Sequence, residues 1–151
     1  MEKLRIIQIG LGHDHAMSGF NSMLAQSDIF EVVGFALPEE ELESGKWTDR
    51  IEEYRDKRGI PYYSLEEILK LEGVEAASIE TEDLYLTKYA LLAAEHRLHI
   101  YMDKPGGTDL ALFEKLAETV KQNNLIFNVG YMYRFNPIVL KTKERIKKGE
   151  L

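Results

Sequence analysis

The sequence contains no cysteine, which excludes a disulfide framework, a thiolate nucleophile and any metal site built on thiolates. It also lacks an apolar run of membrane-spanning length, and its first residues lead into a strand pattern, not a secretion signal. We therefore expect a cytoplasmic protein without a membrane partner. An excess of positive charge is missing as well. The net charge is −7, and since nucleic-acid binding needs a basic surface, nucleic acid is not expected as a partner.

What the sequence does contain is typical of one globular domain: 151 residues, of which 44% are hydrophobic and 30% are charged. Apolar, β-branched segments alternate with segments of helical periodicity, and short loops join them. This alternation predicts an α/β fold, a doubly wound and mostly parallel sheet of about six strands. The expected strands are 6–9, 30–36, 62–63, 74–80, 98–102 and 125–131. The expected helices are 13–26, 39–43, 48–58, 64–73, 84–95, 109–123 and 137–148.

A glycine turn follows the first strand, with Gly10 and Gly12 placed before a helical segment. A strand, a glycine turn and a helix N-terminus together favour an anion, because free N–H groups and the helix dipole point at it. Only two glycines of the G-x-G-x-x-G motif are present, because His15 occupies the third position. From these residues alone, a dinucleotide site and an ordinary tight turn of an α/β domain both remain open.

Lys104 lies between Asp103 and Pro105, directly after an apolar strand. In a parallel sheet, ligands bind beyond the carboxyl ends of the strands, so this lysine faces the expected ligand crevice. Its ammonium group could donate a hydrogen bond to a substrate hydroxyl or carbonyl oxygen, with Asp103 holding its charge. The alternative is an ordinary surface turn with a salt bridge.

His13, Asp14 and His15 form a second group of polar residues, at the start of the first helix. Two histidines and a carboxylate can bind a metal ion. Residues i and i+2 do not share a helix face, however, so the spacing is poor for a shared metal. Helix capping by Asp14 and a histidine contact to a phosphate are the alternatives, and we expect no metal site.

The segments 103–105 (Asp-Lys-Pro) and 128–137 (Asn-Val-Gly-Tyr-Met-Tyr-Arg-Phe-Asn-Pro) resemble the Gfo/Idh/MocA family of sugar and inositol oxidoreductases. The resemblance covers nearly the whole chain. It implies a Rossmann domain for NAD or NADP over residues 1–151. A second domain, carrying much of the substrate site and the oligomer interface, would be absent from this sequence. It further implies that Lys104 is the catalytic lysine, and that a histidine of the second domain completes proton transfer.

The resemblance also assigns the cofactor-binding positions, which are Gly10, Leu11, Gly12, His13, Asp14, His15, Leu37, Thr81, Glu82, Asp103, Lys104 and Arg134. Several of these positions depart from the family pattern. Asp103 replaces a glutamate, Glu82 replaces a proline, and Leu37 stands where an acid usually accepts the ribose hydroxyls. Leu86 stands where a histidine is common. Acidic residues 39–41 would repel a 2′-phosphate, so NAD is favoured over NADP. Because Leu37 cannot accept hydrogen bonds from the ribose hydroxyls, we expect the cofactor to bind weakly.

Two functions fit these observations. In the first, the chain is the nucleotide-binding domain of an oxidoreductase that transfers a hydride to or from a sugar, polyol or related small molecule. Arg134 then lies on the nicotinamide side, and the 151 residues alone give no turnover, because orientation and water exclusion are incomplete. In the second, the chain is a non-catalytic binding or regulatory module. The oligomeric state is open, since an exposed apolar patch would allow homo-oligomers.

Overall fold

The computed structural model describes residues 2–150 and shows one five-stranded sheet in the order β2-β1-β3-β4-β5. Every pair of neighbouring strands is parallel. The expected α/β fold with a parallel, Rossmann-like sheet is therefore confirmed. The strands are β1 (Leu4–Ile9), β2 (Phe30–Ala36), β3 (Ala76–Ile79), β4 (His99–Met102) and β5 (Phe127–Val129).

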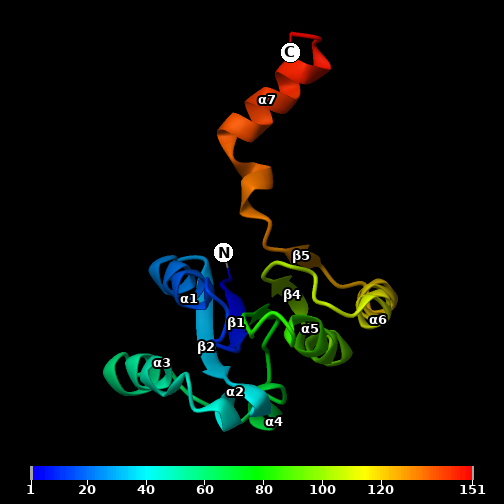
Figure 1. Ribbon diagram of the computed structural model, residues 1–151. Coiled ribbons are helices and arrows are strands. Elements are labelled where there is room, and N and C mark those ends of the chain that lie inside the picture. The colour runs from blue at the N-terminus through cyan, green and yellow to red at the C-terminus, as the bar shows by residue number, and fades with distance from the viewer. Residues whose placement is uncertain (1, 151) are drawn as a thin grey trace.

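Helices flank the two faces of this sheet (Figure 1). Helix α1 (Ala16–Ala25) lies on one side, and α5 (Leu86–Glu95) and α6 (Leu110–Gln122) lie on the other. Shorter elements follow β2: α2 (Glu39–Ser44), α3 (Thr48–Glu52), the π-helix η1 (Glu53–Lys57) and α4 (Leu65–Ile68). After β5 come the 3-10 helix η2 (Met132–Phe135) and α7 (Pro137–Lys147), which extends away from the sheet.

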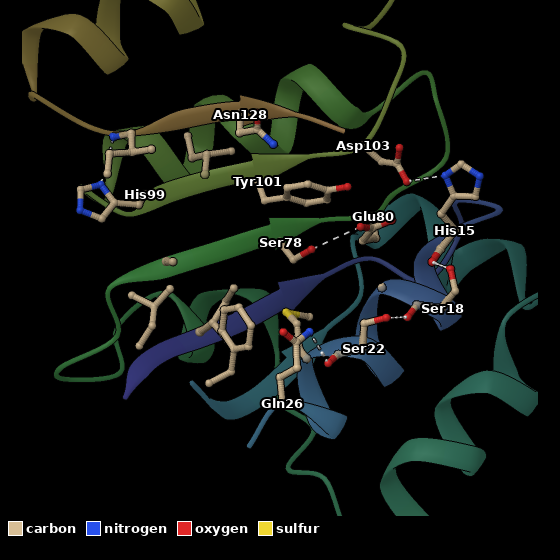
Figure 2. A pocket seen from close by; sticks show the side chains of 18 of the residues that line it. His15, Ser18, Ser22, Gln26, Ser78, Glu80, His99, Tyr101, Asp103 and Asn128 are labelled. Atoms are coloured by element: carbon tan, nitrogen blue, oxygen red, sulfur yellow. Dashed lines mark hydrogen bonds and ion pairs between the residues drawn. The ribbon is translucent and has the colours of Figure 1, made fainter. Parts of the chain in front are cut away.

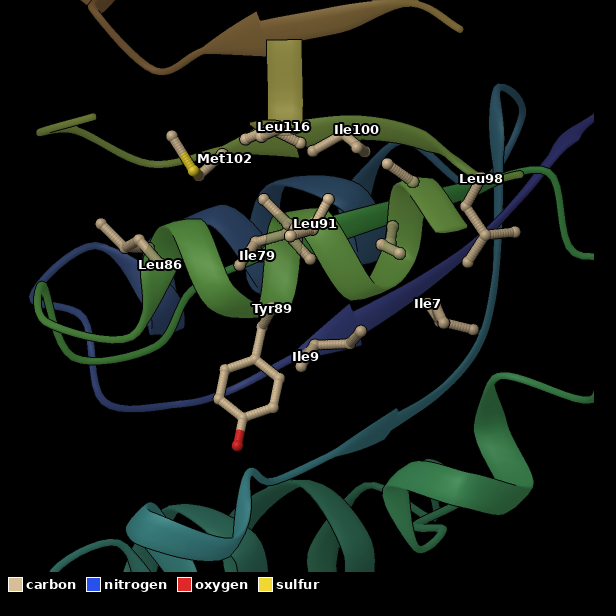
Figure 3. Packing of buried hydrophobic residues seen from close by; sticks show 14 of the residues in the cluster. Ile7, Ile9, Ile79, Leu86, Tyr89, Leu91, Leu98, Ile100, Met102 and Leu116 are labelled. Carbon is tan, nitrogen blue, oxygen red and sulfur yellow. The ribbon is translucent and has the colours of Figure 1, made fainter. Parts of the chain in front are cut away.

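Two hydrophobic cores form because successive strand residues point to opposite faces of the sheet. The larger core joins Ile7, Ile9 and Ile79 of the central strands to apolar residues of α5 and α6 (Figure 3). The smaller core joins the other face of the sheet to Phe20 of α1 and to Tyr54. The sheet is thus fixed from both sides at β1, which carries the glycine turn at its end.

The expected strand at 62–63 is wrong, because this segment makes only an isolated bridge between Phe35 and Tyr62. Pro61 precedes it and has no N–H to donate, which limits how far pairing can extend. The sheet accordingly has five strands and not six.

Capping explains where two helices begin. At α4, Ser64 and Glu67 form a capping box, as the sequence predicts. At α1, the helix begins at Ala16 and has His15 as N-cap without a side-chain cap, so capping by Asp14 is wrong. Residues 13–15 therefore lie in a turn before the helix. No helix of residues 2–150 combines the length and apolarity that crossing a bilayer requires.

Candidate functional site

Three loops meet at the carboxyl edge of the sheet, where β1, β3 and β4 end side by side. They are residues 10–15 after β1, 80–83 after β3 and 103–107 after β4. Most of the predicted site residues lie on these loops, because parallel neighbouring strands bring their carboxyl ends to one edge.

Both glycines of the first turn are needed for close packing against the β3 loop. Gly10 has φ +90°, and a Cβ there would lie 2.7 Å from the backbone nitrogen of Thr81. A Cβ on Gly12 would lie 2.9 Å from the backbone nitrogen of Glu82 and 2.4 Å from Glu41 Oε1. Side chains cannot fit at these separations, so the glycines let two loops and a carboxylate share one small volume.

The Glu41 carboxylate is held by the backbone of these two loops. The N–H groups of Leu11 and Gly12 donate to it at 2.9 Å and 3.2 Å, and the N–H of Glu82 donates at 3.0 Å. Glu41 is only 1% exposed. The glycine turn is therefore an anion-binding nest, and in this structure the anion is the protein's own carboxylate.

Burial makes the charged form of this carboxyl unfavourable. The pKa of Glu41 is raised, mainly by desolvation, although its three backbone hydrogen bonds act in the opposite direction. The nearby Glu82 raises it further. From the sequence, Glu41 is only one of the acidic residues 39–41 that would repel a 2′-phosphate, and its contact with the glycine turn is not predicted. The position of Glu41 in a short acidic helix gave no signal for it.

Leu37 lies in the interior of the fold. Its side chain is 2% exposed and belongs to the core that packs α1 against the sheet. The Leu37 side chain is therefore part of the core, and the assignment of Leu37 as a cofactor-binding residue stays a prediction. The carboxylate that comes closest to the glycine turn is supplied four residues later, by Glu41.

Charged side chains border the outer side of the glycine turn. Glu82 lies against Gly12, and Lys46 approaches its carboxylate at 3.4 Å. Arg50 donates to the backbone carbonyls of Leu11 and His13 and stacks on Trp47. A small pocket opens between these groups, lined by Gly12, His13, Asp14, Lys46, Trp47, Glu82 and Asp83.

His13 and His15 converge on Asp103. The Asp103 Oδ2 atom lies 3.1 Å from His13 Nδ1 and 2.9 Å from His15 Nδ1. Glu80 Oε2 lies 3.9 Å from His13 Nδ1. The spacing of His13 and His15 looked poor for a shared metal because a helix was expected to begin at residue 13. These residues instead form a turn before α1, which lets both imidazoles reach Asp103.

We expected Asp103 to hold the charge of Lys104, but in the structure the Asp103 carboxylate makes no ion pair with the Lys104 ammonium group. One of its oxygens accepts from the backbone N–H of Lys104 at 2.6 Å, and the other faces the histidines. The Lys104 carbonyl accepts from His13 Nε2 at 2.8 Å. Among residues 2–150, no hydrogen bond or ion pair involves the ammonium group of Lys104. The backbone of Lys104 is therefore fixed to the glycine turn while its side chain stays unpaired.

The remaining predicted residues divide in two. Thr81 is fully buried under Gly10 and acts through packing. Arg134 is exposed on η2, on the segment that leads from β5 to α7 (Figure 1). Among residues 2–150, the Arg134 side chain makes no hydrogen bond or ion pair with the three loops, so its place in the site stays a prediction.

A cavity of about 570 Å³ lies between α1 and the sheet, with Glu80 and Asp103 at its polar end (Figure 2). His15 and Ser78 border the same end, and Tyr101 points into the cavity. Burial, together with the charges of Asp103 and Glu80, raises the pKa of Tyr101 to about 12. The pKa of Glu80 is raised too, by burial first and then by Asp103. Two acidic side chains are therefore buried together where the cavity meets the loops, and Glu80 tends to hold a proton there.

Comparison with known proteins identifies the family of this chain. Residues 4–131 match the family model of the Gfo/Idh/MocA oxidoreductases, described as an NAD-binding Rossmann fold. The chain is 32% identical over 104 residues to scyllo-inositol 2-dehydrogenase (NAD(+)) of Bacillus subtilis, covering 68% of this chain and 30% of that protein. It is 24% identical over 105 residues to myo-inositol 2-dehydrogenase of Thermotoga maritima, covering 68% and 31%.

Solved structures share the fold. Myo-inositol 2-dehydrogenase from Lactobacillus plantarum superposes with a TM-score of 0.82 at 18% identity, over 99% of this chain and 42% of that one. Scyllo-inositol dehydrogenase from Lactobacillus casei, with bound NAD(H) and scyllo-inositol, gives 0.78 at 18% identity, over 99% and 42%. The chain thus spans less than half the length of these relatives. It belongs to the Gfo/Idh/MocA oxidoreductase family, and residues 4–131 form the NAD-binding Rossmann domain of that family.

Proposed function

We propose that this chain is the cofactor-binding part of an NAD-dependent dehydrogenase that acts on a polyol or sugar. The observation that carries the proposal is the backbone nest at the glycine turn, which already binds an anion at the carboxyl edge of the sheet. Lys104 lies on the next loop but one and is tied to the same turn through His13. The inositol substrates of the related dehydrogenases suggest the substrate class.

The residues present fit a dinucleotide. The carboxylate of Glu41 stands in for a diphosphate oxygen pair, because it takes the N–H groups of Leu11 and Gly12. A diphosphate would replace Glu41 there, and the cofactor would supply the hydride acceptor or donor. Since Glu41 competes for the same N–H groups, dinucleotide binding is weakened.

The local charge favours NAD over NADP. Glu39 is exposed beyond β2, and Glu82 borders the glycine turn. Lys46 is the cation that pairs with Glu82. A second phosphate on the ribose would add negative charge next to these carboxylates, so it would lower the affinity.

Lys104 is proposed to contact the substrate. Its side chain is unpaired, and its backbone is held by Asp103 and His13. An ammonium group in this position would donate a hydrogen bond to the reacting oxygen and stabilise negative charge on it. A residue from outside these 151 would take up or deliver the proton.

A calorimetric titration of the chain with NADH and, separately, with NADPH tests the cofactor assignment. We expect saturable binding of NADH and weaker binding of NADPH. Gly12→Ala should abolish NADH binding, because the new methyl group fills the space beside Glu82. Circular dichroism confirms that the variant is folded. An absence of NADH binding at millimolar concentration would contradict the proposal.

The catalytic assignment needs a longer protein that contains this chain. There, Lys104→Ala should abolish turnover of a polyol and leave NADH affinity within a few-fold of the original value. A protein that binds NADH but oxidises no polyol or sugar would instead be the non-catalytic module that the departures at Leu37 and Glu82 suggested. Unchanged turnover in the Lys104 variant would contradict the role of the lysine.

A further inference from the structure

Four side chains that can bind a metal meet beside the glycine turn. His13 and His15 follow β1, Glu80 follows β3, and Asp103 follows β4. The ligand atoms of His13, His15 and Asp103 all lie within 4.8 Å of one another. Glu80 Oε2 lies 3.9 Å from His13 Nδ1. Three neighbouring strands thus deliver two imidazoles and two carboxylates to one point.

The hydrogen bonds leave two lone pairs facing each other. His13 Nε2 donates to the Lys104 carbonyl at 2.8 Å, and the backbone N–H of His15 donates to His13 Nδ1 at 3.1 Å. His13 Nδ1 therefore carries a lone pair and no hydrogen. The Asp103 Oδ2 atom lies only 3.1 Å from this nitrogen. Two acceptors at this separation repel each other unless a proton or a metal ion lies between them.

Within residues 2–150, neither carboxylate of this cluster pairs with a lysine or an arginine. Glu80 and Asp103 are each 1% exposed, and the ion pairs they make within residues 2–150 are with histidines alone. Glu80 Oε2 is buried and has no hydrogen-bond partner. Buried charges in proteins are paired or coordinate a metal, and an unpaired buried carboxylate oxygen is costly.

The surroundings of the four ligands are those of a metal site. In three of the four ligands the non-ligating atom is already bonded: His13 Nε2 to the Lys104 carbonyl, Asp103 Oδ1 to the Lys104 N–H, and Glu80 Oε1 to the Ser78 hydroxyl at 3.3 Å. Such outer hydrogen bonds orient metal ligands and fix the histidine tautomer. Bonds of about 2.0–2.2 Å to zinc place neighbouring ligand atoms roughly 3–4 Å apart. The separations from His13 Nδ1 to Asp103 Oδ2 and to Glu80 Oε2 are 3.1 Å and 3.9 Å, and His15 Nδ1 lies 2.9 Å from Asp103 Oδ2.

From this geometry we infer that His13 Nδ1, His15 Nδ1, Asp103 Oδ2 and Glu80 Oε2 bind one divalent transition-metal ion of the zinc type. Two imidazoles among the ligands favour zinc over magnesium or calcium. Coordination exchanges the hydrogen bond from the His15 N–H for a bond to the metal. This inference does not depend on dinucleotide binding, because the cluster forms from the chain alone.

The test is a calorimetric titration of the metal-free protein with ZnCl2 in the absence of nucleotide. The chain is first dialysed against EDTA and then against buffer without chelator. We expect one Zn²⁺ per chain and a higher melting temperature at saturation. His15→Ala removes a ligand whose side chain is 35% exposed, so the fold should persist while Zn²⁺ affinity falls at least tenfold. Glu80→Gln should lower it as well, and MgCl2 should give no comparable heat.

His96→Ala is the matched control, because this histidine is exposed on α5's C-terminal side and lies outside the cluster. It should bind Zn²⁺ as the original chain does. The inference would be overturned if His96→Ala removed Zn²⁺ binding and His15→Ala left it intact. An absence of stoichiometric Zn²⁺ binding would also overturn it, in which case protons alone hold the two carboxylates and the two histidines together.

Discussion

At the scale of single residues, Glu41 occupies the backbone donors of the glycine turn. Its carboxylate accepts from three backbone N–H groups, two of which belong to the turn itself. A dinucleotide diphosphate needs the same donors. In the proposed function, the internal carboxylate would compete with the cofactor for these donors.

Glu41→Gln should increase the affinity for NADH. The amide is neutral and accepts weaker hydrogen bonds, so the diphosphate displaces it more easily and meets less negative charge. Losing one charge-assisted hydrogen bond of about 1.5 kcal/mol corresponds to roughly tenfold tighter binding. Calorimetry at fixed ionic strength measures this change. Glu43→Gln, on the exposed side of α2, is the control and should change little. Weaker binding in Glu41→Gln would show that the carboxylate helps to hold the cofactor.

The raised pKa of Glu41 also predicts a pH dependence of stability. Because its pKa in the folded protein exceeds the ordinary value of 4.5, the folded state binds more protons than the unfolded state above that pH. Stability contributed by this group is present at low pH and falls as pH rises through the raised pKa. The melting temperature of Glu41→Gln, measured relative to the original chain, should therefore increase as pH rises from 4.5. A difference that stays constant with pH would contradict the raised pKa.

Residue-scale chemistry was predictable only in part. The sequence identifies Lys104, the glycines and the histidines by their positions after strands, which the topology alone determines. It could not show that Glu41 reaches the glycine turn or that Asp103 faces the histidines instead of Lys104. Those contacts join residues far apart in the sequence, and their distances depend on how the loops pack.

At the scale of elements, local sequence signals decided most of the fold. The five strands lie within or close to their predicted ranges. In β1 and β2 the signal is a β-branched run that ends before a glycine or a proline. The bridge at Tyr62 is not a strand because Pro61 interrupts pairing. Helix α1 begins three residues later than its hydrophobic periodicity suggested, since the turn at 13–15 is held by side-chain contacts with the β4 loop.

The capping box of α4 predicts a measurable loss of stability. The Ser64 hydroxyl accepts from the N–H of Glu67, and the Glu67 carboxylate accepts from the N–H of Ser64 at 2.9 Å. Ser64→Ala removes the first of these bonds and should destabilise the chain by about 1 kcal/mol in urea unfolding. Ser27→Ala, at an exposed turn, is the control and should leave the unfolding midpoint unchanged. Equal midpoints for both variants would contradict the importance of the cap.

At the scale of the whole molecule, the two faces of the sheet are covered unequally. Helices α5 and α6 cover β3, β4 and β5 on one side, while a cavity of about 570 Å³ remains beside α1 on the other. The segment after β5 exposes large apolar side chains as well, with Tyr133 73%, Phe135 66% and Ile138 75% exposed. Sequence periodicity identifies helices but does not reveal which sheet face stays open.

This exposed apolar surface predicts self-association of the 151-residue chain. Contiguous apolar patches on soluble proteins are usually covered by a partner. Sedimentation velocity should show a mass that rises with concentration. Phe135→Ser combined with Ile138→Ser should shift the equilibrium toward the monomer. A single species of monomeric mass at all concentrations would contradict the prediction.

The most direct test of the central claim is an amide-resolved NMR titration of the ¹⁵N-labelled chain with NADH. If the glycine turn is the dinucleotide site, the amide signals of Leu11, Gly12 and Glu82 should shift saturably, because the diphosphate replaces the Glu41 carboxylate on these N–H groups. Signals from α6, far along the sheet, should stay in place. Saturable shifts confined to other residues, or no shifts at millimolar NADH, would contradict the proposed cofactor site.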